Sequence, residues 1–150
     1  MAHKKLKLLY IARFLLERTD EMHTATVKDI IGYLEGLGIS AERKAIYDDL
    51  ALLEEFGMDI VRTKTKTSNF YLGSREFQLP ELKMLVDVVQ ASPFLTQKKS
   101  MELIGKLEHL ASRHQAMQLR RQVYVMNRIK SPNEQLYYHI DAISQAINTV

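Results

Sequence analysis

The stretch GLGISAERKAIYDDLALLEEFG, residues 36–57, decides the fold. Its first two glycines favour the left-handed turn that ends a helix, and Ser40 supplies a side chain that caps the next one. At about 100° per residue, a helix over 41–56 gathers three apolar side chains on one face: Ile46, Leu50 and Leu53. The stretch therefore predicts a turn followed by an amphipathic helix whose opposite face is available for recognition.

Two amphipathic helices are predicted before this stretch. Residues 4–18 carry apolar side chains at helical spacing, namely Leu8, Ile11, Ala12, Leu15 and Leu16. A second helix repeats that spacing at Val27, Ile30, Ile31 and Leu34, and Thr26 with Asp29 has the spacing of a capping box at its start. Helices two and three, joined by a glycine turn, have the order of a helix-turn-helix.

A basic β-hairpin is predicted after the third helix. Residues 60–67 are rich in β-branched side chains, and their alternation places three cations on one side of the strand: Arg62, Lys64 and Lys66. Ser68 and Asn69 suit a turn, and residues 70–72 suit the returning strand. Three helices followed by a hairpin predict a winged helix-turn-helix over residues 1–75.

Residues 76–150 are predicted to be helical. Pro80 suits the first turn of one helix, Thr96 begins another, and residues 131–134 (SPNE) have the spacing of a capping box before a last helix. The segment 123–126 fits either a strand or an extended linker. The predicted fold class is mostly α with a small β-hairpin, a winged helix-turn-helix followed by a helical subdomain.

The outward face of helix 41–56 is the predicted reader of DNA bases, because a helix-turn-helix presents its second helix to the major groove. Lys44 has donors for guanine or phosphate, Tyr47 suits phosphate or a thymine methyl, and Arg43 flanks them near the helix start. Ser40 leaves amide groups that suit a phosphate. For an isolated helix, a solvated face would be the better interpretation; the element order favours DNA.

Two carboxylates on this helix have structural interpretations. Asp48 lies on the presumed DNA side, where pairing with Lys44, four residues earlier, is favoured over acceptance from a cytosine. Asp49 turns toward the buried flank, where a structural salt bridge is expected. Neither residue is predicted to contact DNA.

The predicted hairpin is locally basic. Residues 60–75 hold four cations and no acid, and three of them (Arg62, Lys64 and Lys66) match a wing along the phosphate backbone. Lysines that protect an exposed edge strand are an equally good interpretation without context. A second stretch, 109–133, holds five cations and no acid, and is more typical of a solvated helix or a surface for an acidic partner.

Composition excludes several classes of protein. The 150 residues contain no cysteine, which removes disulfide scaffolds, Cys-ligated zinc and thiol nucleophiles. No apolar run approaches the ~20 residues of a membrane span, and no signal peptide is evident, so a cytoplasmic location is expected. We find no phosphate loop and no metal-binding or catalytic pattern; His109 and His114 are five apart, which does not put them on one helical face. No enzymatic activity, metal or cofactor is predicted.

The sequence resembles a family of bacterial transcriptional regulators. Residues 5–10 (KLKLLY), 38–50 (GISAERKAIYDDL) and 56–60 (FGMDI) look like the DeoR-type helix-turn-helix of WYL-domain regulators. The resemblance continues through residues 79–83 (LPELK), 98–100 (KKS) and 121–125 (RQVYV), and is most specific over 40–50. It implies a dimeric DNA-binding regulator with a winged helix, a helical linker and a C-terminal effector-sensing domain.

This chain is expected to end before that effector domain. It contains no tryptophan, so it lacks the Trp-Tyr-Leu motif that names the family. Many relatives carry arginine where this chain has Asp48, and glycines often found at the wing tip are missing here. Any effector ligand is therefore expected to bind a domain absent from this chain.

The predicted function is sequence-specific binding of double-stranded DNA by a transcriptional regulator. Helix 41–56 would enter the major groove, and the hairpin over 60–72 would lie on phosphates. The apolar stripes over residues 80–150 exceed what a small winged helix covers, so a homodimer is expected. The alternative is a winged helix that uses its basic patches to bind an acidic protein partner.

Overall fold

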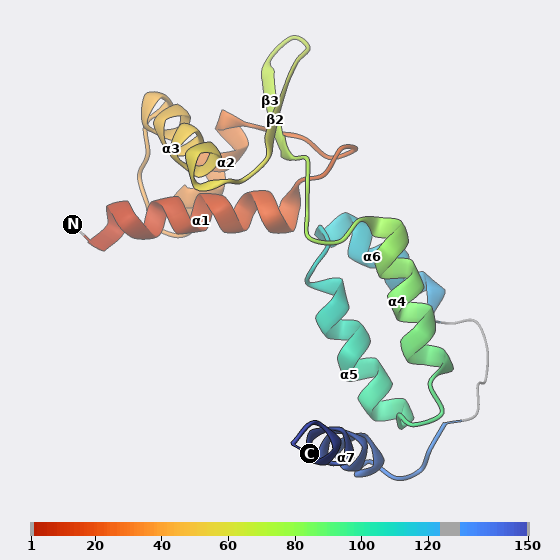
Figure 1. The fold of residues 1–150 in the computed structure, drawn as a ribbon. Helices are drawn as coiled ribbons and strands as arrows, with labels where there is room; N and C mark the ends of the chain where they lie inside the picture. Colours follow the sequence, from red (N-terminus) through yellow and green to blue (C-terminus); the bar gives the residue numbers. More distant parts are fainter. Residues whose placement is uncertain (1, 124–129, 150) are drawn as a thin grey trace. The chain divides into compact units, whose positions relative to one another are not determined.

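The computed structural model describes residues 2–123 and 130–149 (Figure 1). Within them the protein is mostly helical, with seven helices and a small three-stranded antiparallel sheet. The chain divides into two compact units. The first unit is Met1–Glu76 with Ala111–His114, and the second unit is Phe77–Leu110 with Gln115–Val150. The predicted domain boundary, after residue 75, lies within one residue of the point where the chain leaves the first unit, after Glu76. The prediction did not include residues 111–114 in the first unit.

Three helices build the core of the first unit: α1 (Ala2–Arg18), α2 (Val27–Gly36) and α3 (Arg43–Phe56). The predicted apolar stripes are buried at Ile11, Leu15, Ile30, Leu34, Ile46, Leu50 and Leu53. One position in α1 was predicted wrongly. Leu16 is exposed and Phe14 is buried in its place, because the core-facing stripe runs through positions 11, 14 and 15, with Ala12 packed against it.

The two ends of α2 follow their predicted local chemistry. Thr26 Oγ1 accepts from the amide of Asp29, whose carboxylate accepts from the Thr26 amide, so the capping box is formed. At the other end, Gly38 takes a φ of +75°. That left-handed residue lets the amide of Ile39 donate to the Leu34 carbonyl at 2.9 Å, and the Ile39 side chain enters the core.

The sheet has one strand more than predicted, and its order is β1–β3–β2. The hairpin strands are β2 (Ile60–Lys64) and β3 (Ser68–Leu72), and β1 (Ala25–Thr26) pairs with β3 through Ala25↔Phe70. Residues 68 and 69 are thus strand, and the predicted turn at Ser68-Asn69 is wrong. The chain turns over residues 65–67, where the amide of Thr65 donates to the Thr67 carbonyl.

A buried polar cluster attaches residues 111–114 to the rest of the first unit. Asp20 accepts from the Ser112 hydroxyl and from the Met22 amide, and its Oδ1 lies 2.8 Å from His23 Nδ1. Burial alone raises the pKa of Asp20, but these hydrogen bonds together hold that pKa below its ordinary value. The imidazoles of His23 and His114 also stack, with centroids 3.6 Å apart.

Thr19 connects α1 to the sheet beside this cluster. Its hydroxyl donates to the Leu15 carbonyl and accepts from the Leu72 amide. Its own carbonyl accepts from the Arg75 guanidinium at 2.8 Å. Burial lowers the pKa of Arg75, although the charge of Asp20 opposes that shift. Arg75, one of the four cations of the basic stretch 60–75, is thus a structural residue.

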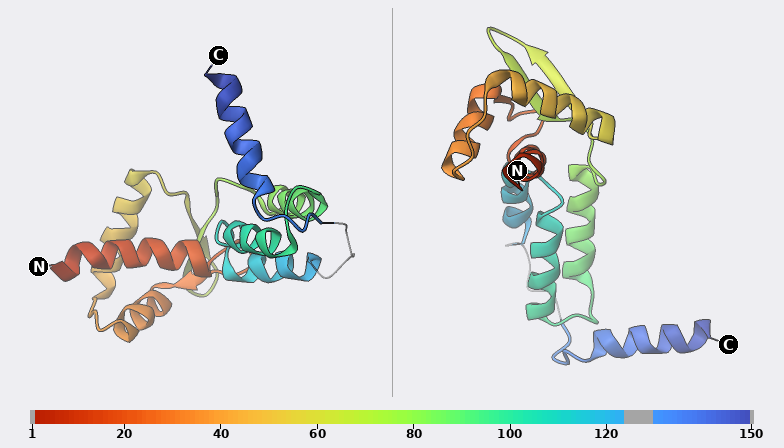
Figure 2. Two further views of the ribbon diagram at one scale, coloured as in Figure 1. Left: turned by 90° about the horizontal axis from the view of Figure 1, so that it is seen from below. Right: turned by 90° about the vertical axis from the view of Figure 1, so that its left-hand side faces the viewer.

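The second unit contains α4 (Leu79–Ala91), α5 (Gln97–Glu108) and most of α6 (Arg113–Gln122). Figure 2 shows α4 and α5 side by side, with α6 against them. The predicted starts are confirmed: Pro80 lies in the first turn of α4, and Thr96 caps α5 by accepting from the Lys99 amide. The bounds of α6 were not predicted, because the helix buries only two residues, Ala116 and Leu119.

The last helix, α7 (Leu136–Asn148), has no buried residue. Its predicted capping box is wrong: the Ser131 hydroxyl accepts from the Asn133 amide, and the helix begins later, after Gln135. Lys99 of α5 lies 5.4 Å from the ring of Tyr137 and 5.7 Å from that of Tyr138. Of the predicted strand or linker at 123–126, all but Val123 lies outside the described residues.

Candidate nucleic-acid interface

The outward face of α3 presents exposed polar and small side chains. Lys44, Asp48 and Ala51 are exposed, whereas Ile46, Leu50 and Leu53 on the opposite face are buried. This division follows from the helical spacing predicted for residues 41–56. Figures 1 and 2 show α3 and the β2–β3 hairpin on the same side of α1. The two predicted DNA-contacting elements therefore belong to one side of the first unit.

Tyr47 is a candidate recognition residue whose side chain also packs against the core. Its ring is half-buried and meets Phe70 edge-on at 5.9 Å. Its hydroxyl accepts from the Arg43 guanidinium at 3.4 Å, and the same guanidinium lies 5.9 Å from the ring. Arg43 is exposed and is thereby held over α3. The hydroxyl end, rather than the ring, is available to a ligand.

The prediction that Ser40 caps α3 is wrong, while its contact with phosphate stays a prediction. The residue that caps α3 is Glu42, whose backbone is extended and whose side chain makes no capping bond. Ser40 is exposed and lies two positions earlier. Ile39 is buried, residues 39–42 belong to no helix or strand, and the helix starts at Arg43. The hydroxyl of Ser40 is therefore not at the helix start.

Of the two predicted carboxylate pairings on α3, one is formed and the other is not. Asp49 forms the expected structural salt bridge, with Lys7 Nζ of α1 at 2.7 Å from its Oδ2. The expected pair of Lys44 and Asp48 is absent from the ion pairs among the described residues. Both side chains point into solvent, where an exposed pair gains little over hydration. Asp48 therefore stays a negative charge on the outward face.

Arg62 does not extend freely from the hairpin. Its guanidinium donates to Glu54 Oε1 of α3 at 2.8 Å and lies 5.8 Å from the ring of Phe70. Residue 62 pairs with residue 70 across the strands, so its stem covers the edge of the core. Arg62 therefore differs from Lys64 and Lys66 in that a carboxylate already pairs with it, and its contact with phosphate stays a prediction. Glu54 was missed because its pairing crosses two elements and has no local spacing signal.

Lys64 and Lys66 are exposed, as Arg62 is, but among the described residues they form no ion pair. Lys64 ends β2, and Lys66 lies in the turn over 65–67 rather than on the strand. No carboxylate of the described chain lies within ion-pair distance of Lys44, Lys64 or Lys66. These three cations, which we call the exposed lysine set, are available to a phosphate without breaking an existing pair.

The second basic stretch, 109–133, does not form one surface patch. Arg113 pairs with Glu17 at 3.0 Å, and Arg120 pairs with Glu108 at 2.8 Å. Lys130 donates to the last carbonyls of α4, those of Val89 and Ser92. Most of its described cations therefore satisfy neighbouring groups, as the solvated interpretation predicts, while residue 128 lies outside the described residues.

Two large apolar side chains stand beside the outward face of α3. Phe56 is 84% exposed and Leu52 is 51% exposed, both in the last turns of the helix. Neither was predicted to be a site residue, although they repeat at a helical spacing of four. Such a pair is typical of a contact with another apolar surface.

Other kinds of site find no support in the described chain. No group of three or more histidine, aspartate or glutamate side chains is placed to hold a metal ion among residues 2–123 and 130–149. In the same ranges, each helix is too short or too polar to cross a bilayer.

Comparison with known proteins gives no family. No family model, no curated protein and no solved structure matches this chain. The resemblance to WYL-domain regulators therefore stays a prediction from the residues that carry it.

Proposed function

We propose that this protein is a sequence-specific DNA-binding transcriptional regulator of the cytoplasm. In this proposal residues 2–76 act as a winged helix-turn-helix, α3 enters the major groove, and the β2–β3 hairpin lies on phosphates. The single observation that carries the proposal is the exposed lysine set: three cations, on α3 and at the hairpin tip, on one side of one unit and without carboxylate partners in the described chain.

The division of labour between these residues follows from their placement. Lys44, on the exposed face of α3, is placed to reach base edges or phosphate, and Arg43 with the Tyr47 hydroxyl flanks it. Lys64 and Lys66 at the hairpin tip are suited to phosphates, which supply affinity without sequence information. Arg62 contributes by fixing the hairpin to α3 through Glu54.

A homodimer completes the proposal. The helix α7 carries Leu136, Ile140, Ile143 and Ile147 at alternating spacings of four and three, the seam that two helices bury in a coiled coil. A second copy of α7 would cover this seam, since Ile140, Ile143 and Ile147 are exposed in the described part of the chain. Two-fold symmetry would then present two copies of α3 to sites about 34 Å apart or a multiple of that distance.

The experiment that tests DNA recognition begins with selection of a duplex from a random library. Lys44→Ala should weaken binding to the selected duplex by about 1–3 kcal/mol if Lys44 reads a base edge. Tyr47→Phe, which removes the hydroxyl and keeps the ring on Phe70, separates recognition from packing. Lys106→Ala, an exposed cation on α5, is the matched charge control. Equal affinities for all four proteins would contradict this placement of α3.

The hairpin is tested by salt dependence. The double variant Lys64→Ala, Lys66→Ala should weaken binding to selected and random duplexes alike. It should also reduce the slope of log K against log salt by about 0.9 for each phosphate that the variant no longer neutralises. An unchanged slope would assign both lysines to edge protection instead.

The alternative function is contact with an acidic protein partner, and the exposed pair Leu52 and Phe56 favours it. The two proposed functions, DNA binding and binding of a protein partner, predict different effects of Phe56→Ala on binding. Loss of partner binding with no selectable duplex would support the alternative. Unchanged DNA affinity of this variant, together with a selected duplex, would support the regulator.

A further inference from the structure

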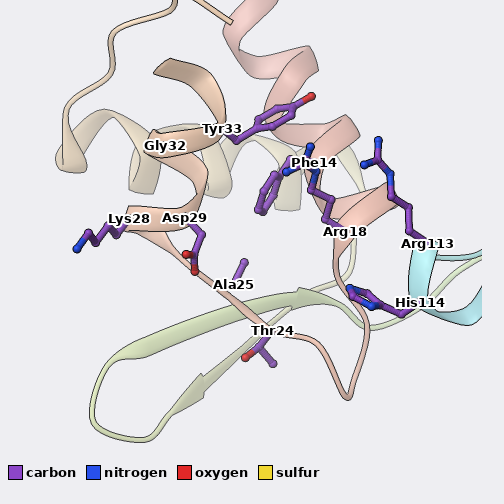
Figure 3. Close-up of a pocket in the computed structure, with 10 residues that line it drawn as sticks. All are labelled: Phe14, Arg18, Thr24, Ala25, Lys28, Asp29, Gly32, Tyr33, Arg113 and His114. Carbon is purple, nitrogen blue, oxygen red and sulfur yellow. The ribbon is translucent and has the colours of Figure 1, made fainter. Parts of the chain in front are cut away.

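A wide groove in the first unit lies between α1 and α2 and is bordered by the start of α6, in the segment Ala111–His114 (Figure 3). Its volume is about 910 Å³, which suits a metabolite rather than a single ion. None of the residues that line it belongs to α3 or to the β2–β3 hairpin. We call it the α1–α2 groove.

The α1–α2 groove is lined by more positive than negative charge. Arg18 comes from α1, Lys28 from α2 and Arg113 from the start of α6. Among the described residues, Lys28 and Arg18 have no carboxylate within ion-pair distance, while Arg113 pairs with Glu17. The one carboxylate that lines the groove, that of Asp29, is engaged by the amide and hydroxyl of Thr26, each at 2.7 Å.

Two aromatic rings hold the guanidinium of Arg18. Its central carbon lies 4.7 Å from the centroid of Tyr33 and 5.8 Å from that of Phe14, and the two rings pack at 5.1 Å. A guanidinium held on ring faces keeps its N–H edge available for two parallel bonds to an oxyanion. These contacts restrict its orientation before a ligand arrives, which reduces the entropy lost on binding.

Gly32 keeps the α2 wall of the α1–α2 groove low. It lies inside α2, where glycine is less favourable than alanine by about 1 kcal/mol. Packing does not explain this residue, because a Cβ added there would meet nothing within 4 Å. A side chain at position 32 would instead occupy the α1–α2 groove, which Gly32 lines (Figure 3). The glycine leaves the helix backbone open to a close approach by a ligand.

We propose that the α1–α2 groove binds a small polyanion that carries phosphate or carboxylate groups. Arg18 would bind one oxyanion through its ring-held edge, and Lys28 and Arg113 would bind others along the groove. A ligand in this place would contact α1, α2 and the segment 111–114 at once. The proposal does not rest on DNA binding, because it uses none of the exposed lysine set.

The test is calorimetric titration of the full chain with inorganic triphosphate and, separately, with citrate, at one ionic strength set with sodium chloride. Saturable binding of at least one probe is expected, and Arg18→Gln should weaken it by about tenfold. Binding of triphosphate alone identifies phosphate as the preferred group, and binding of citrate alone identifies carboxylate. Binding of both identifies a general polyanion site; each result supports the groove if the variant weakens it.

Gly32→Leu is the second variant, because it fills the α1–α2 groove without removing a charge. It should abolish probe binding and raise Tm, since leucine is the better helix former. Gly105→Leu in α5, another helical glycine whose added Cβ meets nothing within 4 Å, is its control. Lys106→Gln is the control for charge, and both controls should bind like the parent chain.

Three outcomes would overturn the proposal. The first is no binding of either probe at about 1 mM. The second is binding that neither Arg18→Gln nor Gly32→Leu changes, which means diffuse attraction to the surface. The third is a loss of random-duplex affinity in Arg18→Gln equal to that of the hairpin double variant, which would assign the groove cations to the DNA backbone.

Discussion

The helices α3 and α7 have similar apolar patterns in their sequences, but the apolar face is buried in α3 and exposed in α7. They have 14 and 13 residues, and each repeats apolar side chains at helical spacing. The stripe of α3 lies in the core with Leu50 fully buried, while Ile143 of α7 is 60% exposed. The pattern therefore predicts a helix and an apolar face, but the surface that covers the face depends on the rest of the assembly.

The largest expected effect is truncation in the stripe of α3. Leu50→Ala should lower the free energy of unfolding by about 2–5 kcal/mol, because it leaves a cavity in a filled core. Ile143→Ala in α7, measured on the monomer by urea denaturation, should change it by less than about 0.5 kcal/mol. Similar losses in both variants would mean that α7 is buried in the monomer.

The second effect concerns the buried polar cluster around Asp20 in the first unit. In contrast, α7 has no buried residue. Asp20→Asn should cost about 1–3 kcal/mol, because it disturbs hydrogen bonds to Ser112 and His23. The pKa of Asp20 is lowered in the folded state. Its stabilisation is therefore complete above the unfolded value of about 3.9 and is lost as pH falls through the lower folded value.

Urea denaturation from pH 7 to pH 3 checks this assignment. The difference in unfolding free energy between the parent chain and Asp20→Asn should shrink toward the acid end of that range. A difference that stays constant with pH would show that ionisation of Asp20 does not contribute to the fall in unfolding free energy at acid pH.

The third effect compares two helix starts. Thr26→Ala should cost about 1 kcal/mol, because the capping box of α2 is formed. Ser131→Ala should cost far less, because Ser131 lies outside α7 and its hydroxyl only accepts from the Asn133 amide. Thermal unfolding of both variants measures the contrast. Equal losses would show that the predicted cap of α7 forms in solution.

The smallest effect on the subunit, and the most informative for assembly, is a charge on the seam of α7. Ile143→Asp should leave the unfolding free energy of the monomer nearly unchanged, because the side chain is already in solvent. It should abolish the proposed dimer by burying an unpaired carboxylate. Sedimentation at micromolar concentration decides, and a dimer that survives the substitution would place the interface elsewhere.

Much of the fold was predictable because its signals are local. Helical spacing located the core faces of α2 and α3, the Thr26–Asp29 box located the start of α2, and Thr96 located that of α5. Two of the misses lie where tertiary contacts determine the local structure. Ile39 is buried and α3 starts past Ser40, and pairing with β2 and β1 keeps residues 68 and 69 in the sheet.

The candidate site was predicted in part. Lys44, Lys64 and Lys66 are exposed as expected, but Arg62 is engaged by Glu54 across the fold, and no spacing rule reports such a pair. The α1–α2 groove was missed for the same reason, since its cations come from three elements. One local signal existed: Arg18 lies four residues after Phe14 on the same helical face.

The contact between Asp20 and Ser112 spans 92 positions, and it orders events during synthesis on the ribosome. The three helices and the sheet of the first unit are complete once residue 76 has emerged, yet the partner of Asp20 arrives 36 residues later (112 − 76). At about 5–20 residues per second, this delay is roughly 2–7 s. During that interval the nascent chain holds Asp20 without its Ser112 hydrogen bond, so the first unit gains this contact only after α4 and α5 have been made.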